Sequence, residues 1–275
     1  MYISQLTGVY LAWRGTDDHL NIISSTDGEN FGQKIVLSDT SHVGLSLAVF
    51  NNRLYVAWTG TDDHLNIISS TDGKNFEQKV VLPETSNSGL ALAVFNNQLH
   101  LAWRGTDDHL NIISSTDGEN FGQKIVLSET SRVGLALAVF NSRLYVAWTG
   151  TDDHLNIISS IDGKNFEQKV VLPETSNSGL ALAAFNNRLH LAWRGTDDHL
   201  NIMSSTDGEN FGQKIVLSDT SHIGLALAVF SSRLYLTWTG TDNHLNVISS
   251  TNGTNFEQKV VLPETSNSGL ALTGV

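Results

Sequence analysis

The stretch AWTGTDDHLNIISSTDGKNF, from Ala57 to Phe76, gathers side chains that could act on a ligand. Asp62 and Asp63 are adjacent carboxylates of the kind that supply the acid and the base of a glycosidase, and the imidazole of His64 lies beside them. Trp58 offers an aromatic face on which a sugar ring can stack. Nearly the same text occurs six times in the chain, so any chemistry that these residues perform is repeated.

Each copy contributes a tryptophan and the first aspartate and the histidine of the following turn, and every second copy adds an arginine after the tryptophan. The candidate ligand-binding residues are therefore Trp13, Arg14, Asp17, His19, Trp58, Asp62, His64, Trp103, Arg104, Asp107, His109, Trp148, Asp152, His154, Trp193, Arg194, Asp197, His199, Trp238, Asp242 and His244. The tryptophans have a second interpretation, because each ends an apolar run and can equally pack in a core.

The repeat predicts the architecture. Successive tryptophans lie 45 residues apart, and six such units span almost all of the 275 residues. A second period of 90 residues is superimposed, because odd units read AWRG and ENFGQKIVLS whereas even units read WTG and NFEQKVVLPETSNSGL. Self-similarity at such a period is typical of repeat folds, so the chain consists of three copies of a two-unit block.

Within one unit the hydrophobic period is two, which indicates strands. Gly44 to Phe50 and Arg53 to Trp58 are apolar runs joined by two asparagines, which predicts a tight hairpin. Leu65 to Ser69 and Gln78 to Leu82 predict a third and a fourth strand on either side of an Asp-Gly turn.

Four strands in about 45 residues, repeated six times, are typical of a β-propeller. We predict an all-β fold, with residues 1–275 forming one six-bladed propeller of four-stranded antiparallel blades. Gly8 to Trp13 matches a second strand and Gly269 to Val275 matches a first strand, so the two ends should complete one shared blade. Met1 to Gln5 overlaps the register of that first strand, but we expect the C-terminal segment to be innermost because its GLAL text matches the other blades.

The segment SSTDGENF, from Ser24 to Phe31, resembles the Asp-box of bacterial neuraminidase repeats. The family pattern is Ser-x-Asp-x-Gly-x-Thr-Trp; Ser24, Gly28 and Phe31 fall in register with it, and Asp27 sits one place late. The resemblance implies an Asp-box propeller, as in sialidases and some non-catalytic propellers, with these turns on the face opposite the active site. Asp27 can accept N–H groups of its own turn, so we expect a structural role for the motif.

Strand direction predicts which turns share a face. If the Asp-Gly turns and the inner hairpins lie on one face, then the turn Thr61 to His64 and the loop from Pro83 to Asn87 must lie on the other. We expect the ligand on this second face, in clefts between blades. Odd and even units differ there, with Arg14 against Thr59, so the clefts should form two sets of three.

Repeat symmetry argues against an enzyme. Blades so alike cannot present the unlike residues that a catalytic site needs, and adjacent aspartates on an exposed turn gain little desolvation to separate an acid from a base. Arg14, Arg104 and Arg194 invite comparison with the arginine triad of sialidases, but they should stand more than ~10 Å apart. We expect them to pair with acidic residues of neighbouring loops instead, and we expect no catalytic residue.

Composition excludes several classes of ligand and partner. The chain has no cysteine, and the Asp-Asp-His turns lack the ligand spacing of zinc or calcium sites, so we expect neither metal nor cofactor. The net charge of −12 opposes binding to nucleic acid, and the apolar runs are too short to span a membrane. We expect a monomer, and the sequence does not indicate a compartment.

The combined hypothesis is a non-catalytic, multivalent carbohydrate-binding propeller with repeated weak sites between blades. The architecture is similar to that of six-bladed fucose-binding lectins, a resemblance that implies sites between adjacent blades built from Trp, Arg and Glu. Two alternatives stay open. One is a structural or protein-interaction propeller made by recent or engineered amplification of a repeat, and the other is a sialidase-like glycoside hydrolase.

Overall fold

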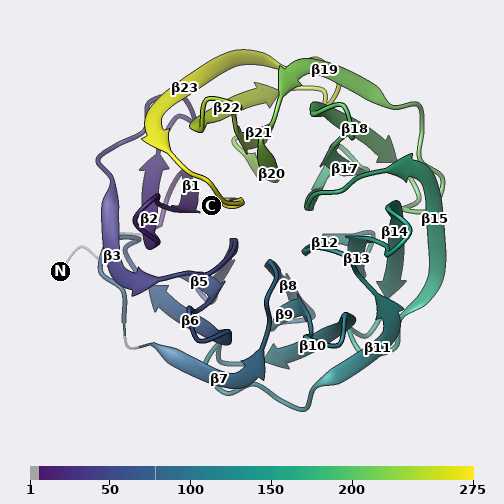
Figure 1. The fold of residues 1–275 in the computed structure, drawn as a ribbon, viewed down its shortest axis with the longest axis horizontal. Coiled ribbons are helices and arrows are strands. Elements are labelled where there is room, and N and C mark those ends of the chain that lie inside the picture. Colours follow the sequence, from purple (N-terminus) through teal and green to yellow (C-terminus); the bar gives the residue numbers. More distant parts are fainter. Residues whose placement is uncertain (1–5, 78) are drawn as a thin grey trace.

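Six four-stranded antiparallel sheets stand around a central axis in the computed structural model, which describes residues 6–77 and 79–275 (Figure 1). Blade 1 has the strand order β24-β1-β2-β3, and blades 2 to 6 follow as β4–β7, β8–β11, β12–β15, β16–β19 and β20–β23. The predicted six-bladed propeller is therefore confirmed.

In each blade the strands run from the axis to the rim. The inner strands are β24 (Leu270–Gly274), β4 (Leu45–Phe50), β8 (Leu90–Phe95), β12 (Leu135–Phe140), β16 (Leu180–Phe185) and β20 (Ile223–Phe230). The second strands are β1 (Val9–Arg14), β5 (Arg53–Thr59), β9 (Gln98–Arg104), β13 (Arg143–Thr149), β17 (Arg188–Arg194) and β21 (Arg233–Thr239). The third strands are β2 (His19–Ser25), β6 (His64–Ser70), β10 (His109–Ser115), β14 (His154–Ser160), β18 (His199–Ser205) and β22 (His244–Ser250). The outer strands are β3 (Ile35–Thr40), β7 (Val80–Thr85), β11 (Ile125–Thr130), β15 (Glu167–Thr175), β19 (Ile215–Thr220) and β23 (Glu257–Thr265).

The predicted inner hairpin is confirmed. Phe50 pairs with Arg53, and the two residues between them, Asn51 and Asn52, have φ values of 48° and 58°. Two consecutive left-handed residues form the turn that matches the right-handed twist of the flanking strands, and asparagine tolerates this conformation better than most residues.

The outer strand lies further along the chain than predicted. We expected Gln78 to Leu82, but β7 covers Val80–Thr85, and Gln78 lies outside the described residues. The cause is a register shift between the pairs Asn66–Val81 and His64–Thr85, which leaves extra residues on β7. Pro83 sits in this irregular part of an edge strand, where its missing N–H breaks no ladder.

Ring closure follows the predicted route. The C-terminal strand β24 pairs with β1, with Leu272 opposite Leu11, and the N–H of Val275 donates to the carbonyl of Gly8 at 2.9 Å. The C-terminal segment is therefore the innermost strand of blade 1, as expected. Residues 1–5, the alternative, lie outside the described part of the chain.

The core consists of six apolar layers between neighbouring sheets. In the layer between blades 1 and 2, Trp58 packs with Ala12 and Ile22 of blade 1 and with Leu47 of its own blade. Its indole N–H donates to the carbonyl of Thr40, at the end of the outer strand of blade 1, at 3.1 Å. The tryptophan thus joins two blades by packing and by a hydrogen bond.

A ring of ion pairs joins the outer strands. Each pair links a lysine of one blade to an acidic residue of the blade before it, and Lys34 with Glu264 closes the ring at 3.0 Å. The other pairs are Lys79–Asp39, Lys124–Glu84, Lys169–Glu129, Lys214–Glu174 and Lys259–Asp219. Because these side chains are partly exposed, each pair contributes at most about 1 kcal/mol.

The Asp-Gly turns have the structural role that we expected. Asp72 accepts hydrogen bonds from the N–H groups of Lys74 and Asn75 at 2.8 and 2.7 Å, and from the hydroxyl of Ser70 at 2.9 Å. The bonded serine is thus the second of the pair, not the one that we aligned with the Asp-box. When Ser70 and Asp72 are aligned with the Ser-x-Asp of the family pattern, Gly73 follows the aspartate directly, one place earlier than the glycine of that pattern.

Replacing Asp72 by Ala should lower the free energy of unfolding by about 1 kcal/mol, because the turn N–H groups lose their acceptor. Asp72→Asn is the matched control, since Asn252 accepts the same bonds through its amide oxygen in the last copy. The turn hydrogen bonds lower the pKa of Asp72, so its contribution is present above the pKa of an unfolded aspartate and is lost as the pH falls below it. Urea unfolding at pH 7 measures both variants, and an unchanged stability of D72A would contradict this role.

Candidate functional site

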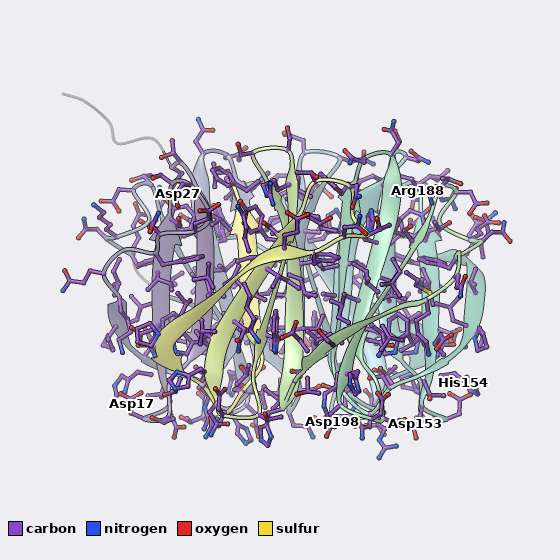
Figure 2. The ribbon with its side chains drawn as sticks, turned by 90° about the horizontal axis from the view of Figure 1, so that it is seen from above. Asp17, Asp27, Asp153, His154, Arg188 and Asp198 are labelled. Carbon is purple, nitrogen blue, oxygen red and sulfur yellow. The ribbon has the colours of Figure 1, made fainter. Side chains whose placement is uncertain are left out.

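The two faces of the ring carry different turns, as Figure 2 shows. Asp17, Asp153, His154 and Asp198 lie on what we call the lower face, which the turns between second and third strands share with the loops between blades. Asp27 lies on the opposite, upper face, with the Asp-Gly turns and the inner hairpins. On the lower face the N–H of Ser86 donates to the carbonyl of the preceding turn at 2.9 Å. The predicted division of the turns is confirmed.

The six tryptophans belong to the core. Trp13, Trp58, Trp103, Trp148, Trp193 and Trp238 are each 1% exposed. An indole buried between two sheets has no face for a sugar ring. Of the two interpretations of these residues, their burial therefore supports the core and not the stacking platform.

The arginines of the odd blades hold loops together. Arg104 donates through Nε to the carbonyl of Ser131 at 2.7 Å and through Nη1 to Oδ1 of Asn87 at 2.7 Å, and it forms an ion pair with Asp108. Its side chain is 16% exposed. Arg14 and Arg194 form the equivalent ion pairs with Asp18 and Asp198. The expected pairing is confirmed, and it leaves these guanidinium groups few donors for a ligand.

Even blades place a basic side chain against the second aspartate of the turn by another route. Thr59 replaces the arginine, and His42 of the preceding loop contacts the carboxylate of Asp63 at 3.0 Å. In blade 4, Arg132 forms the matching ion pair with Asp153. The second aspartate of the turn thus meets a basic side chain from its own strand in odd blades and from the preceding loop in these even blades.

The first aspartate and the histidine of each turn are exposed. The carboxylate of Asp62 accepts the N–H of His64 at 3.2 Å, and a Cβ on Gly60 would overlap that carboxylate. The side chain of Asp62 is 67% exposed and that of His64 is 41% exposed. These groups, and their copies, can meet a ligand, but they project from turns and line none of the clefts described next.

Clefts between blades open beside the upper face, which the sequence did not predict. We name each cleft by its two blades: cleft 1/2 has a volume of 520 Å³, cleft 2/3 of 420 Å³, cleft 3/4 of 580 Å³ and cleft 5/6 of 280 Å³. In each, the third and outer strands of one blade face the Asp-Gly turn of the next. A further cavity of 180 Å³ on the axis is lined by the inner strands, mainly by leucine and alanine.

Cleft 2/3 combines charge, hydroxyls and apolar surface. Arg53 pairs with Glu77 and donates to the hydroxyl of Ser69 at 2.9 Å. Ile67 and Ile68 line the same cleft. The hydrogen bond from the Arg53 guanidinium holds the pKa of the Glu77 carboxyl below its usual range, so this carboxylate is ionised at neutral pH.

Part of this arrangement recurs in every even blade. Arg143 and Arg233 donate through Nε to Ser159 and Ser249, each at 3.0 Å, as Arg53 does to its serine. Odd blades have glycine at the position of Glu77, namely Gly32, Gly122 and Gly212. The 90-residue period therefore also divides the blades into two sets of three by their residues near the upper face.

Two buried histidines distinguish the odd blades. Even blades have tyrosine at this position, and Tyr55 donates to the carbonyl of Asp117 at 3.2 Å. His100 and His190 replace it in blades 3 and 5, are each 1% exposed, and have no hydrogen-bond partner for either ring nitrogen among the described residues. Burial lowers the pKa of both, that of His190 to about 4, so both rings are neutral at pH 7.

The described residues offer neither a metal site nor a membrane-spanning helix. Within residues 6–77 and 79–275, no group of three or more His, Asp or Glu side chains is placed to hold a metal ion. In the same residues, no helix has the length and apolar character needed to cross a membrane.

Comparison with solved structures finds the same fold in lectins. The BP39L lectin from Burkholderia pseudomallei superposes with a TM-score of 0.70 and 13% identity, over 97% of this chain and 88% of that chain. A triple arginine-to-alanine mutant of AofleA from Arthrobotrys oligospora superposes with a TM-score of 0.71 and 12% identity, over 100% of this chain and 92% of that chain. The lectin from Aleuria aurantia is a six-bladed propeller described with a novel mode of fucose recognition. It superposes with a TM-score of 0.62 and 9% identity, over 96% of this chain and 98% of that chain.

An enzyme also shares the fold. An α-L-arabinofuranosidase from Clostridium thermocellum superposes with a TM-score of 0.57 and 12% identity, over 82% of this chain and 95% of that chain. No protein-family model matches the sequence, and no curated protein is similar to it. At such low identity, the likeness to the solved structures shows the fold alone.

The buried histidines predict a loss of stability in mild acid. An unfolded histidine has a pKa of about 6.5, whereas that of folded His190 is about 4. Between pH 7 and pH 5 the unfolded chain therefore binds a proton at this position and the folded protein does not, which lowers the free energy of unfolding by about 2 kcal/mol. The double variant His100→Tyr and His190→Tyr should lose much less over this range, and Tyr10 already occupies the position in odd blade 1. Replacing exposed His64 by Gln is the control and should behave as the parent does. Equal stability of the parent protein at pH 7 and pH 5, measured by urea unfolding, would contradict the prediction.

Proposed function

We propose that the chain is a non-catalytic, multivalent carbohydrate-binding protein whose main sites are the clefts that follow the even blades. The observation that carries the proposal is the cluster of Arg53, Glu77 and Ser69 at the edge of cleft 2/3, beside the apolar wall of Ile67 and Ile68. The arginine and serine recur in blades 4 and 6.

This combination suits a sugar. A pyranose presents hydroxyl groups that both donate and accept, together with apolar C–H patches, so it binds best where a few fixed polar groups adjoin an apolar wall. An ion-paired arginine and glutamate supply charged donors and acceptors, whose hydrogen bonds are stronger than neutral ones. The pair also holds both side chains in place before the ligand arrives, which reduces the entropy cost of binding.

The solved neighbours suggest which sugar to try first. The Aleuria aurantia lectin has been solved with α-methyl-L-fucoside, and the BP39L protein is likewise a lectin. These likenesses support a carbohydrate ligand for this fold, and L-fucosides are the rational first probe.

Electrostatics support a binding role over hydrolysis. A glycosidase needs one carboxyl group with a raised pKa to protonate the leaving group. The pKa of Glu77 is instead lowered by its partner Arg53, which keeps this carboxyl group ionised. The recurrence of the arginine and serine in three even blades favours avidity on a multivalent surface, where weak sites act together.

The lower face is the second candidate location for the sugar. Its exposed Asp62 and His64, with their copies in the other blades, are the residues that the sequence favours. They offer polar groups without a cleft, so we rank them below the upper clefts.

A protein-interaction role is the second candidate function. Six valines of the outer strands, one per blade, face solvent around the perimeter: Val36, Val81, Val126, Val171, Val216 and Val261, which are 52–54% exposed. Repeated apolar side chains on edge strands can bind another protein. This role predicts no sugar binding at any site.

Titration calorimetry with methyl α-L-fucoside tests the proposal. We expect about three weak sites per chain, which should disappear in the triple variant Arg53→Gln, Arg143→Gln and Arg233→Gln because the sugar loses its charged donor. The control is the triple variant Asp62→Asn, Asp152→Asn and Asp242→Asn on the lower face, which should bind as the parent protein does. If the aspartate variant loses binding and the arginine variant keeps it, the sites lie on the lower face. If a glycan array detects no sugar at all, the lectin proposal is wrong.

A further inference from the structure

The upper clefts alternate in charge around the ring. The residue after each Asp-Gly turn is Glu29, Glu119 or Glu209 where the turn faces an even blade. Cleft 2/3 is thus lined by Glu77, Glu119 and Lys79, and Arg53 pairs with Glu77 at its edge. Where the turn faces an odd blade, the residue is Lys74, Lys164 or Thr254, and the glutamate of the facing blade is replaced by glycine. Clefts that follow even blades are therefore the more acidic set, and clefts that follow odd blades are the more basic set.

Cleft 5/6 departs furthest from the others. Arg188 is the only residue lining it that is charged at neutral pH. Its neighbour across the cleft is Asn252, which stands where the other five turns have aspartate. Cleft 5/6 therefore has a neutral amide at this turn, where the other five turns carry a carboxylate.

Arg188 has no acidic partner. Among the described residues no carboxylate lies within ion-pairing distance of its guanidinium, and its contact with the hydroxyl of Ser204 is long, at 3.4 Å. Arg53, at the same position of blade 2, is held by Glu77. Figure 2 shows Arg188 on the upper face, where it is exposed and can meet a ligand.

A second observation points to a missing ligand. His190 lines the cleft, is 1% exposed, and has no hydrogen-bond partner for either ring nitrogen within residues 6–77 and 79–275. Buried polar groups are almost always satisfied, so an unpartnered ring beside an unpaired cation is an incomplete polar site. Thr254 and Ser204 add hydroxyl groups, and Ile202 and Met203 add apolar surface.

We infer that cleft 5/6 binds a sugar that carries a carboxylate, with Arg188 as the ionic anchor and Ser204, Asn252 and Thr254 as partners for the sugar hydroxyls. The cleft volume of 280 Å³ and its mixed polar and apolar lining fit one sugar ring. The inference rests on the proposed function, because it assigns an acidic sugar to one of the same family of clefts. The chain would then have neutral-sugar sites after the even blades and one acidic-sugar site between blades 5 and 6.

Calorimetry with methyl β-D-glucuronide and its neutral counterpart methyl β-D-glucoside tests this inference. We expect one glucuronide site per chain, with at least tenfold weaker binding of the glucoside, and with weakening at high salt as an ion pair requires. Arg188→Gln should weaken glucuronide binding at least tenfold. Arg132→Gln, which removes an exposed arginine from the lower face, is the control and should leave it unchanged.

A second variant distinguishes a loss of binding from a loss of folding. Asn252→Asp restores the aspartate of the other five turns, so it should fold at least as well as the parent, and yet it places a carboxylate in the cleft. It should also weaken glucuronide binding at least tenfold.

The other outcomes separate the two proposals. If methyl α-L-fucoside binds and the glucuronide does not, this inference is wrong and the proposed function stands. If neither sugar binds, this inference is wrong, and the glycan array decides whether the proposed function stands. Unchanged glucuronide binding by R188Q, or its displacement by acetate at equal concentration, would also overturn the inference, since the site would lie elsewhere or would bind any carboxylate.

Discussion

Every blade junction depends on one contact, in which the glycine of an Asp-Gly turn lies against an aromatic ring of the preceding blade. A Cβ on Gly118 would overlap the hydroxyl of Tyr55, and Gly253 meets the ring of His190 in the same way. Both glycines also have positive φ values, so the turn requires glycine for its conformation as well as for its fit. Because interiors are packed at high density, this contact fixes how far each turn reaches over the neighbouring sheet. The clefts beside the upper face are the space that remains under these turns, and their chemistry follows from the residues on either side.

The 90-residue period adds chemical differences between blades to a fold that a 45-residue period would satisfy. Even blades combine tyrosine with an arginine and a glutamate, whereas odd blades have histidine or tyrosine beside glycine, so the ring presents two kinds of cleft. The lower face uses the same alternation for stability, since Arg104 in an odd blade and His42 before an even blade each meet the second aspartate of a turn. Near-identical repeats can therefore differ in the charge and polarity of their surfaces, with the exchange of a buried tyrosine for histidine as the accompanying change between the sheets.

The sequence predicted the fold well because period, alternation and turn residues all follow from local chemistry. The hairpin at Asn51, the closing strand β24 and the division of the turns between two faces needed only strand direction and residue type. The site was harder to predict, because its residues meet only through long-range folding. The alternation of a strand does not say whether Trp58 at its end is covered by a neighbouring blade, and Arg53 reaches Glu77 only after the chain has turned back at Asp72. The register shift in β7 also escaped prediction. Pro83 indicates an edge strand, but it does not say how many residues of β7 lack a pairing residue on β6.

The central claim is that the upper clefts, and not the lower turns or the axial cavity, hold the carbohydrate. A crystal structure of the protein soaked with methyl α-L-fucoside tests it most directly. We predict density for a sugar ring beside Arg53, Arg143 and Arg233, with its hydroxyl groups within hydrogen-bonding distance of the guanidinium groups. Density beside Asp62 and His64 on the lower face, or among the leucines of the inner strands on the axis, would contradict the account.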